Sequence, residues 1–170
     1  MYGYRAATSL ALDAWVKVYN GSLGITLTDT YTTDAFFSSF NLQQAKLFDG
    51  VRCDSGDPLT FADKAVRFYE QMRIDPTSKT IVFSDSLDVL RVKEIKSYVR
   101  NRIHDTYGIG TFFSNDVGAK PLNIVIKLSH VKADSREGGY LEAIKLSDAS
   151  GKHTGDIGEI AIAKQTLGIK

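Results

Sequence analysis

Four short apolar runs, each ending in polar residues or glycine and alternating with helix-like patterns, constrain the fold of this chain more than any other feature. The runs end near Leu27, Cys53, Ser84 and Tyr107. The polar or glycine positions that follow them, Asp29, Asp54, Asp85 and Gly110, are separated by 25, 31 and 25 residues. Such intervals suit a strand, a loop and a helix, so the repeat predicts βα units in a parallel sheet with right-handed crossovers.

Apolar residues at helical spacing support the same interpretation. The stripes are Ala7, Leu10, Ala11, Ala14 and Val18 in the first helix, Ala62, Val66, Tyr69 and Met72 in the second, and Leu87, Val92, Ile95 and Val99 in the third. Pro58 suits the first turn of the second helix. Each stripe marks the face on which its helix is expected to pack.

The pattern changes at Pro121. Two strand-like runs, "PLNIVIKLSHV" and "GYLEAIKLSD", are joined by a segment that contains Gly138 and Gly139, which permit a turn. We therefore expect an antiparallel hairpin from Leu122 to Ser147, apart from the parallel strands, and a last helix from Ile157 to about Leu167. The sequence thus predicts two units, a partial α/β-barrel at 1–120 and a hairpin with a helix at 121–170.

Length and composition limit the possible roles. The chain has 170 residues, with 21 Lys and Arg against 20 Asp and Glu, so no global charge indicates a nucleic acid or a membrane surface as a partner. No apolar run approaches the ~20 residues of a membrane span. The single cysteine, Cys53, is compatible with a reducing compartment, and cytoplasmic localisation is expected. The histidines His104, His130 and His153 have no metal-binding spacing.

The carboxyl ends of the four strands carry the candidate site, because parallel sheets bind ligands where their βα loops gather. The loops supply an arginine, carboxylates, hydroxyls and a glycine-rich turn, which together suit a sugar phosphate with an acidic partner. The candidate residues are Asp29, Thr30, Arg52, Asp54, Ser55, Asp57, Ser84, Asp85, Gly108, Gly110 and Thr111. Arginine offers a planar fork of donors to a carboxylate or phosphate, and the glycines let backbone N–H groups approach an anion.

A simpler interpretation exists for each loop taken alone. Asp29, Asp54, Asp57 and Asp85 are also ordinary turn and helix-capping residues, and Gly56 permits a positive φ. An aldolase or isomerase barrel would require a lysine or a base at a strand end, and no lysine occupies an obvious position of this kind. A non-catalytic module that binds a phosphate ligand, or that regulates, remains an alternative.

Six blocks in order resemble the nicotinate phosphoribosyltransferase family. They are "LGITLTDTYTTDAF", "FDGVRCDSGDP", "KTIVFSDSLDV", "YGIGTFFSND", "LNIVIKL" and "KLSDASGKHTGD". The resemblance implies an α/β fold, a partial (β/α) barrel of the type II phosphoribosyltransferase kind with a C-terminal β-hairpin and helix. It also implies a cytoplasmic enzyme, dimeric when intact, that joins nicotinate to 5-phosphoribosyl 1-pyrophosphate with Mg²⁺ and ATP. The sibling nicotinamide phosphoribosyltransferase is a second possibility.

The resemblance also assigns roles. Asp29, Arg52 and Asp54 would be catalytic, with Arg52 on the pyridine carboxylate and Asp29 and Asp54 as metal ligands. The substrate-binding set would be Thr30, Ser55, Asp57, Ser84 and Asp85, together with Gly108, Gly110 and Thr111 around the 5-phosphate. A phosphorylated histidine precedes the first helix in this family, whereas this chain starts after that motif, so we expect the C-terminal portion of the enzyme, inactive alone.

Overall fold

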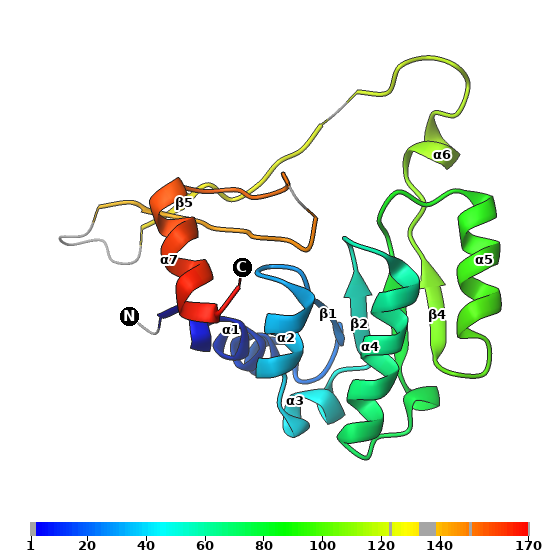
Figure 1. The fold of residues 1–170 in the computed structure, drawn as a ribbon, viewed down its shortest axis with the longest axis horizontal. Coiled ribbons are helices and arrows are strands. Elements are labelled where there is room, and N and C mark those ends of the chain that lie inside the picture. Colours follow the sequence, from blue (N-terminus) through cyan, green and yellow to red (C-terminus); the bar gives the residue numbers. More distant parts are fainter. Residues whose placement is uncertain (1–2, 123, 133–138, 150, 170) are drawn as a thin grey trace.

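The fold consists of a four-stranded parallel sheet with its helices, followed by a small C-terminal unit (Figure 1). The computed structural model describes residues 3–122, 124–132, 139–149 and 151–169. In chain order the elements are α1 (Gly3–Tyr19), β1 (Ile25–Leu27), α2 (Thr33–Ser39), α3 (Leu42–Leu47), β2 (Gly50–Cys53), α4 (Pro58–Gln71), the 3₁₀ turn η1 (Pro76–Ser78), β3 (Thr80–Phe83), α5 (Val89–Val99), β4 (His104–Tyr107), α6 (Thr111–Ser114), β5 (His130–Val131), β6 (Leu141–Glu142) and α7 (Ile157–Leu167).

The sheet has the predicted topology. Its strands lie in the order β1-β2-β3-β4, and every neighbouring pair is parallel. The carboxyl ends are in register, with Cys53 beside Phe83 and Phe83 beside Tyr107. All four loops that follow the strands therefore leave the sheet at one edge, which we call the carboxyl edge.

One face of this sheet is packed and the other is open. Val51, Cys53, Ile81 and Phe83 are buried within the core to which α4 and α5 contribute, and both helices cover the near face in Figure 1. The alternate residue Arg52 points to the opposite face and is exposed there. Because successive side chains of a strand face opposite sides, the strand that buries Val51 and Cys53 necessarily presents Arg52 on the open face. The barrel is therefore partial, as predicted.

The helices of the core confirm most of the predicted stripes. In α4, Ala62, Val66 and Tyr69 are buried, and Ile95 and Val99 are buried in α5. Leu87 is buried too, but it lies before the first residue of α5.

The predicted apolar face of α1 is not its buried face. Leu12 is the residue that the described part of α1 buries, whereas Ala11 and Ala14 are exposed and Val18 is 69% exposed. Helical periodicity identifies an apolar face but does not say what covers it. Here the helix turns a different side toward α2 and the sheet, and the predicted stripe stays largely bare.

The C-terminal unit pairs as predicted over a short length. β5 and β6 are antiparallel, with His130 opposite Glu142, and they form a sheet separate from the parallel strands. Gly138 lies outside the described residues, and Gly139 leads into β6. Within the described part of the run before β5, Ile124, Val125 and Ile126 pair with no strand and are 62% to 94% exposed. This half of the predicted strand therefore has no partner in the described structure.

The last helix, α7, has the predicted bounds and packs on α1. The Tyr4 hydroxyl donates a hydrogen bond to Glu159, and Arg5 Nε donates to the carbonyl of Thr166 at 2.8 Å. The unit at 121–170 is thus joined to the unit at 1–120 at its far end. The boundary at residue 120 itself stays a prediction. Over the described part of the chain, the helices are too short or too polar to span a bilayer.

The exposed apolar run predicts self-association of the 170-residue chain, since unpaired β-prone segments attract a second copy. Replacing Ile126, which is 94% exposed, by lysine should lower the mass measured by analytical ultracentrifugation toward that of a monomer. The matched control is Leu90→Lys on the surface of α5, which is 75% exposed and lies outside the run. Equal association of both variants and the parent would contradict the prediction.

Candidate functional site at the carboxyl edge

Arg52 and Asp54 form the centre of the carboxyl edge. Arg52 donates from Nη2 to Asp54 Oδ1 at 2.8 Å and from Nε to Ser84 Oγ at 2.8 Å, and Ser84 Oγ is also 2.8 Å from Asp54 Oδ1. The Arg52 side chain is 44% exposed and that of Asp54 is 26% exposed. Two strands thus bring a cation, a carboxylate and a hydroxyl within hydrogen-bond distance, with part of each charged group still open to a ligand.

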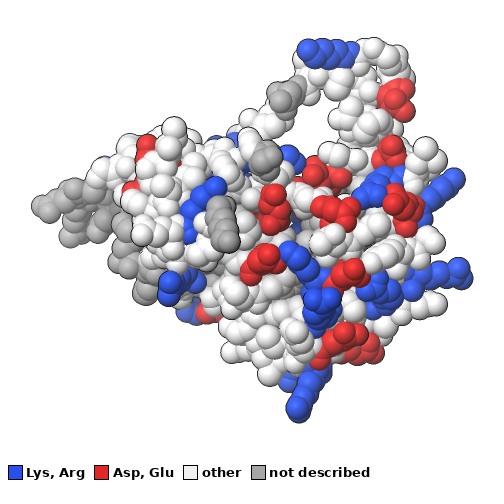
Figure 2. Space-filling model, viewed as in Figure 1, with Lys and Arg blue, Asp and Glu red and all other residues white. Residues whose placement is uncertain are grey.

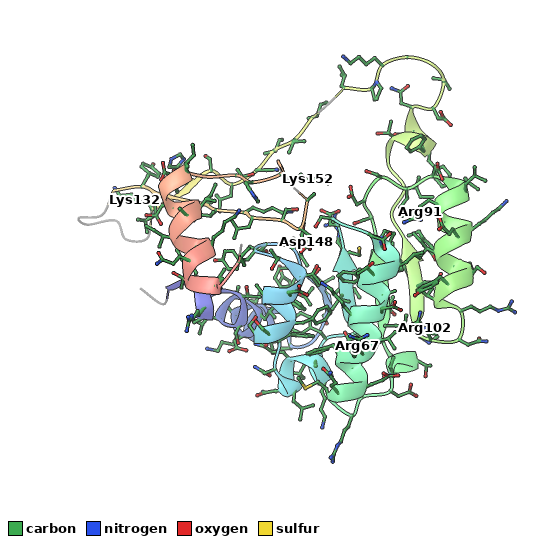
Figure 3. The ribbon with its side chains drawn as sticks, in the orientation of Figure 1. Arg67, Arg91, Arg102, Lys132, Asp148 and Lys152 are labelled. Carbon is green, nitrogen blue, oxygen red and sulfur yellow. The ribbon has the colours of Figure 1, made fainter. Side chains whose placement is uncertain are left out.

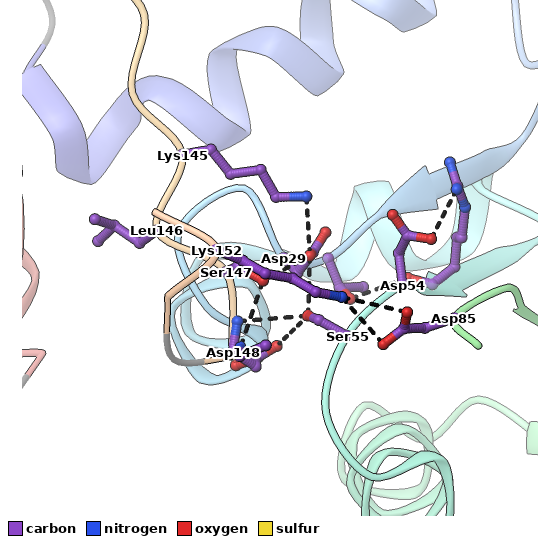
Figure 4. Close-up of polar contacts among 12 residues, drawn as sticks. Asp29, Asp54, Ser55, Asp85, Lys145, Leu146, Ser147, Asp148 and Lys152 are labelled. Carbon is purple, nitrogen blue, oxygen red and sulfur yellow. Dashed lines mark hydrogen bonds and ion pairs between the residues drawn. The ribbon is translucent and has the colours of Figure 1, made fainter. Parts of the chain in front are cut away.

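Asp29, at the end of β1, lies deeper. Its carboxylate is almost completely buried, at 1% exposure. Oδ2 contacts Lys145 Nζ at 3.0 Å, Ser55 Oγ at 2.9 Å and Ser147 Oγ at 3.3 Å (Figure 4). Oδ1 is buried and has no hydrogen-bond partner among the described residues. Asp29 therefore joins the loops after β1 and β2 to a segment from the far end of the chain.

That segment, Lys145–Lys152, is the part of the site that the loop-by-loop prediction missed. Lys145 and Thr154 exchange backbone hydrogen bonds at 2.8 and 2.9 Å, which folds the segment back on itself. The Leu146 N–H donates to the Thr30 carbonyl at 2.8 Å. Figure 3 shows Asp148 and Lys152 on the side of the segment that is turned toward the sheet. The block "KLSDASGK" entered the sequence analysis only as part of the family resemblance. It was the one sequence signal that could have placed this segment at the site.

Asp148 anchors the segment. It accepts hydrogen bonds from the backbone N–H and from the hydroxyl of Thr33, at 2.9 and 2.6 Å, and its own N–H donates to Ser55 Oγ at 3.4 Å. Lys152 Nζ lies 3.2 and 3.3 Å from the two oxygens of Asp85. In the space-filling view the acidic side chains gather in the centre of this face with basic ones among them (Figure 2).

The caps of the helices decide between capping and ligand binding for several residues. α2, α4 and α5 are capped by Thr32, Asp57 and Asp88. Asp57 caps α4, because its carboxylate accepts from the Thr60 N–H at 2.8 Å, and its role in substrate binding stays a prediction. That backbone hydrogen bond, with the nearby Arg91, lowers the pKa of Asp57. Asp29, Asp54 and Asp85 cap none of the helices in the described ranges, so their positions at the edge need another explanation.

The glycine-rich turn lies beside the loop after β3. A Cβ on Gly108 would meet Ser84 Cβ at 3.4 Å, an ordinary van der Waals contact, so the two loops lie side by side and a small side chain would also fit there. Gly110 caps the single turn of α6, and Thr111 begins it. No backbone acceptor among the described residues takes the N–H of Gly110 or of Thr111. Both amides are free to meet a ligand, although a cleft that unites Gly110 with the three carboxylates stays a prediction.

The cysteine and the histidine near the site give little support to thiol or metal chemistry. Burial raises the pKa of the Cys53 thiol to about 12, so the thiol is neutral and unreactive. His153 Nδ1 contacts the Leu146 carbonyl. Within the described ranges, no cluster of three or more His, Cys, Asp or Glu side chains could hold a metal ion.

Comparisons with known proteins agree with this geometry. The sequence profile of the nicotinate phosphoribosyltransferase (NAPRTase) family matches residues 3–169. The chain belongs to the nicotinate phosphoribosyltransferase family. The nicotinate phosphoribosyltransferase of Chromohalobacter salexigens is 51% identical over 99% of this chain and 43% of its own length. That of Desulforapulum autotrophicum is 54% identical over 94% of this chain and 41% of its own length.

A solved member of the nicotinate phosphoribosyltransferase family has the same fold. The crystal structure of the Porphyromonas gingivalis nicotinate phosphoribosyltransferase superposes with a TM-score of 0.93 and 49% identity, covering 99% of this chain and 43% of that one. The chain therefore spans less than half the length of the relatives it matches. The similarity extends over nearly the whole chain, including both the carboxyl edge and the segment that contacts it.

The ion pair between Lys145 and Asp29 generates a stability prediction. Lys145→Met leaves a buried carboxylate without its cation and should lower the free energy of unfolding by about 3 kcal/mol, the low end for a broken buried pair because the Lys145 side chain is 28% exposed. Adding Asp29→Asn to this variant removes the unpaired charge and should restore part of the loss. Urea unfolding of the 170-residue chain measures both.

The control is Lys64→Met, which breaks the exposed pair with Asp34 and should cost no more than about 1 kcal/mol. Two results would contradict this prediction: a double variant as unstable as Lys145→Met, or a loss for Lys145→Met no larger than that of the control. Either would show that the Lys145–Asp29 pair contributes little to the free energy of unfolding.

Proposed function

We propose that this chain supplies the nicotinate- and phosphoribosyl-binding edge of a nicotinate phosphoribosyltransferase. The reaction joins nicotinate to 5-phosphoribosyl 1-pyrophosphate and releases nicotinate mononucleotide and pyrophosphate, as expected for NAD biosynthesis. The observation that carries the proposal is Arg52, which emerges on the open face between Asp54 and Ser84 and keeps 44% of its side chain exposed. Family membership supports the assignment of this edge to that substrate pair.

Each residue then has a physical task. The Arg52 guanidinium binds the pyridine carboxylate, for which its paired donors are suited. Asp85 accepts hydrogen bonds from ribose hydroxyls, and the Ser84 hydroxyl can donate to them or accept from them. Asp54 stabilises the positive charge that develops on the ribose as pyrophosphate leaves. The N–H groups of Gly110 and Thr111 bind the 5-phosphate, and Gly108 belongs to the same turn.

The remaining predicted residues position the site without contacting substrate. Asp29 is buried against Lys145 and Ser55, so we propose that Asp29, Thr30 and Ser55 position the edge, and that Asp57 shapes it by capping α4. Lys145 contacts Oδ2 of Asp29, and Oδ1 has no partner among the described residues, so a metal ion at Asp29 would bind through Oδ1 and lie close to the Lys145 ammonium group. Its metal role is therefore the less favoured part of the original assignment.

This chain offers one partly exposed carboxylate, that of Asp54, as a ligand for Mg²⁺. Mg²⁺ commonly uses one or two carboxylates together with substrate phosphate oxygens, and Asp54 offers a half-open carboxylate at the edge. Asp54 would therefore hold the ion together with the diphosphate, and the ion would neutralise the leaving pyrophosphate. ATP coupling, a dimeric state and a cytoplasmic location are further parts of the proposal that rest on the family alone.

A chimera tests the function. In the Porphyromonas gingivalis protein, the part that this chain matches is replaced by the chain itself, which the 0.93 TM-score makes feasible. The chimera should form nicotinate mononucleotide from nicotinate and 5-phosphoribosyl 1-pyrophosphate, measured by chromatography. Failure of a folded chimera to form product would contradict the proposed function and would favour the alternative of a binding or regulatory module.

Within the chimera, Arg52→Ala should raise the KM for nicotinate by about tenfold to a hundredfold, the size of a lost charged hydrogen bond. Arg52→Lys should recover only part, because an ammonium cannot replace the planar fork. Arg102→Ala, which removes a partner of Asp63 away from the edge, is the control and should leave the KM unchanged. Better use of nicotinamide than nicotinate by the unmodified chimera would instead identify the sibling activity.

A further inference from the structure

Lys152 reaches the candidate site from the opposite end of the chain. The backbone pairing of Lys145 with Thr154 turns the C-terminal segment back toward the sheet, and the Lys152 side chain extends across the edge to Asp85 (Figure 4). Asp85 is one of the residues proposed to bind the ribose. A cation from a distant segment therefore lies at the substrate end of β3.

The contact between Lys152 and Asp85 is a weak one. Its two distances, 3.2 and 3.3 Å, are longer than the 2.8 Å contacts of Arg52, and the Lys152 side chain is 48% exposed. An ion pair this exposed contributes little to stability. The segment is already held by Asp148 on Thr33 and by Lys145 on Asp29. Anchoring the segment therefore does not require Lys152.

The other two cations of the edge have other partners or another proposed ligand group. Lys145 faces the buried carboxylate of Asp29, and Arg52 donates from two of its nitrogens to Asp54 and Ser84. Lys152 has three donors, and among the described residues its ion-pair partner is the partly exposed Asp85. If ribose hydroxyls donate to Asp85, they compete for the oxygens that Lys152 now contacts. The ammonium group would then be released next to the phosphate groups of the same ligand.

We propose that Lys152 is a substrate-contacting residue that exchanges Asp85 for an anionic phosphate or diphosphate oxygen of the phosphoribosyl substrate. This inference rests on the proposed function, and it adds a residue from the C-terminal segment to the site. A lysine suits the task because its flexible stem carries a point charge that binds phosphate without a fixed geometry.

Kinetics of the chimera provide the first test. Lys152→Met should raise the KM for 5-phosphoribosyl 1-pyrophosphate by about tenfold or more, as expected for a lost charge-assisted hydrogen bond, and should change the KM for nicotinate less than twofold. Lys152→Arg keeps the charge and should restore most of the affinity. The matched control is Lys96→Met. The Lys96 ammonium is also 3.2 Å from a carboxylate, that of Asp105, but Asp105 lies near the start of β4, at the opposite edge of the sheet.

A double-mutant cycle with Asp85→Asn separates contact with substrate from support of Asp85. If Lys152 only positions Asp85, Lys152→Met has no further effect once Asp85 is neutralised. If Lys152 contacts the substrate, the KM for 5-phosphoribosyl 1-pyrophosphate rises again in the Asp85→Asn background. The first outcome, or an equal rise for both substrates, would overturn the proposal while leaving the proposed function intact.

A binding measurement does not depend on turnover. Calorimetric titration of the 170-residue chain with inorganic pyrophosphate and Mg²⁺ should give at least fivefold weaker affinity for Lys152→Met than for the parent or Lys96→Met, about the loss expected for one exposed cation near an anion. Equal affinity of the three proteins would overturn the role of Lys152. Loss of product formation by the unmodified chimera, with this difference in affinity retained, would overturn the proposed function and leave Lys152 as an anion-binding residue.

Discussion

The buried carboxylate of Asp29 is the interaction on which the arrangement of the carboxyl edge depends. A carboxylate at 1% exposure is costly unless a cation and hydrogen-bond donors compensate for lost hydration. Lys145 and Ser147 come from the C-terminal segment, and Ser55 comes from the loop after β2. One charge therefore fixes three parts of the chain relative to one another. Separating the segment from the sheet would leave Asp29 without its cation.

The open face of the sheet determines what this edge can bind. β2 buries Val51 and Cys53 in the packed core, which commits Arg52 to the other side. Asp54 and Ser84 orient the guanidinium without burying it. Because the chain spans 41% to 43% of the length of its first two curated relatives, the catalytic proposal concerns a protein of their full length. The face of the sheet on which Arg52 lies, however, follows from the strand alone.

Sequence patterns predicted those parts of the fold that depend on residues close together in the chain. The four parallel strands, the antiparallel direction of the hairpin and the bounds of α7 agree with the sequence patterns, whereas the helix after β4 is the single turn α6. Periodicity failed for α1, because an apolar stripe does not identify its partner. In the site, Arg52 and Asp54 were predictable from one loop. Lys145, Asp148 and Lys152 were not, because their partners lie far away in the sequence and only the three-dimensional fold brings them together.

Hydrogen–deuterium exchange of the chimera, with and without 5-phosphoribosyl 1-pyrophosphate and Mg²⁺, tests most directly whether the strand-end loops and the C-terminal segment form one site. The account predicts slower exchange on ligand addition in peptides that cover 52–57, 84–88, 108–111 and 145–153. A cavity of about 550 Å³ at the opposite edge, lined by Lys96, Arg100 and His104 among others, is the internal comparison. Protection at 96–105 with none at 145–153 would contradict the account.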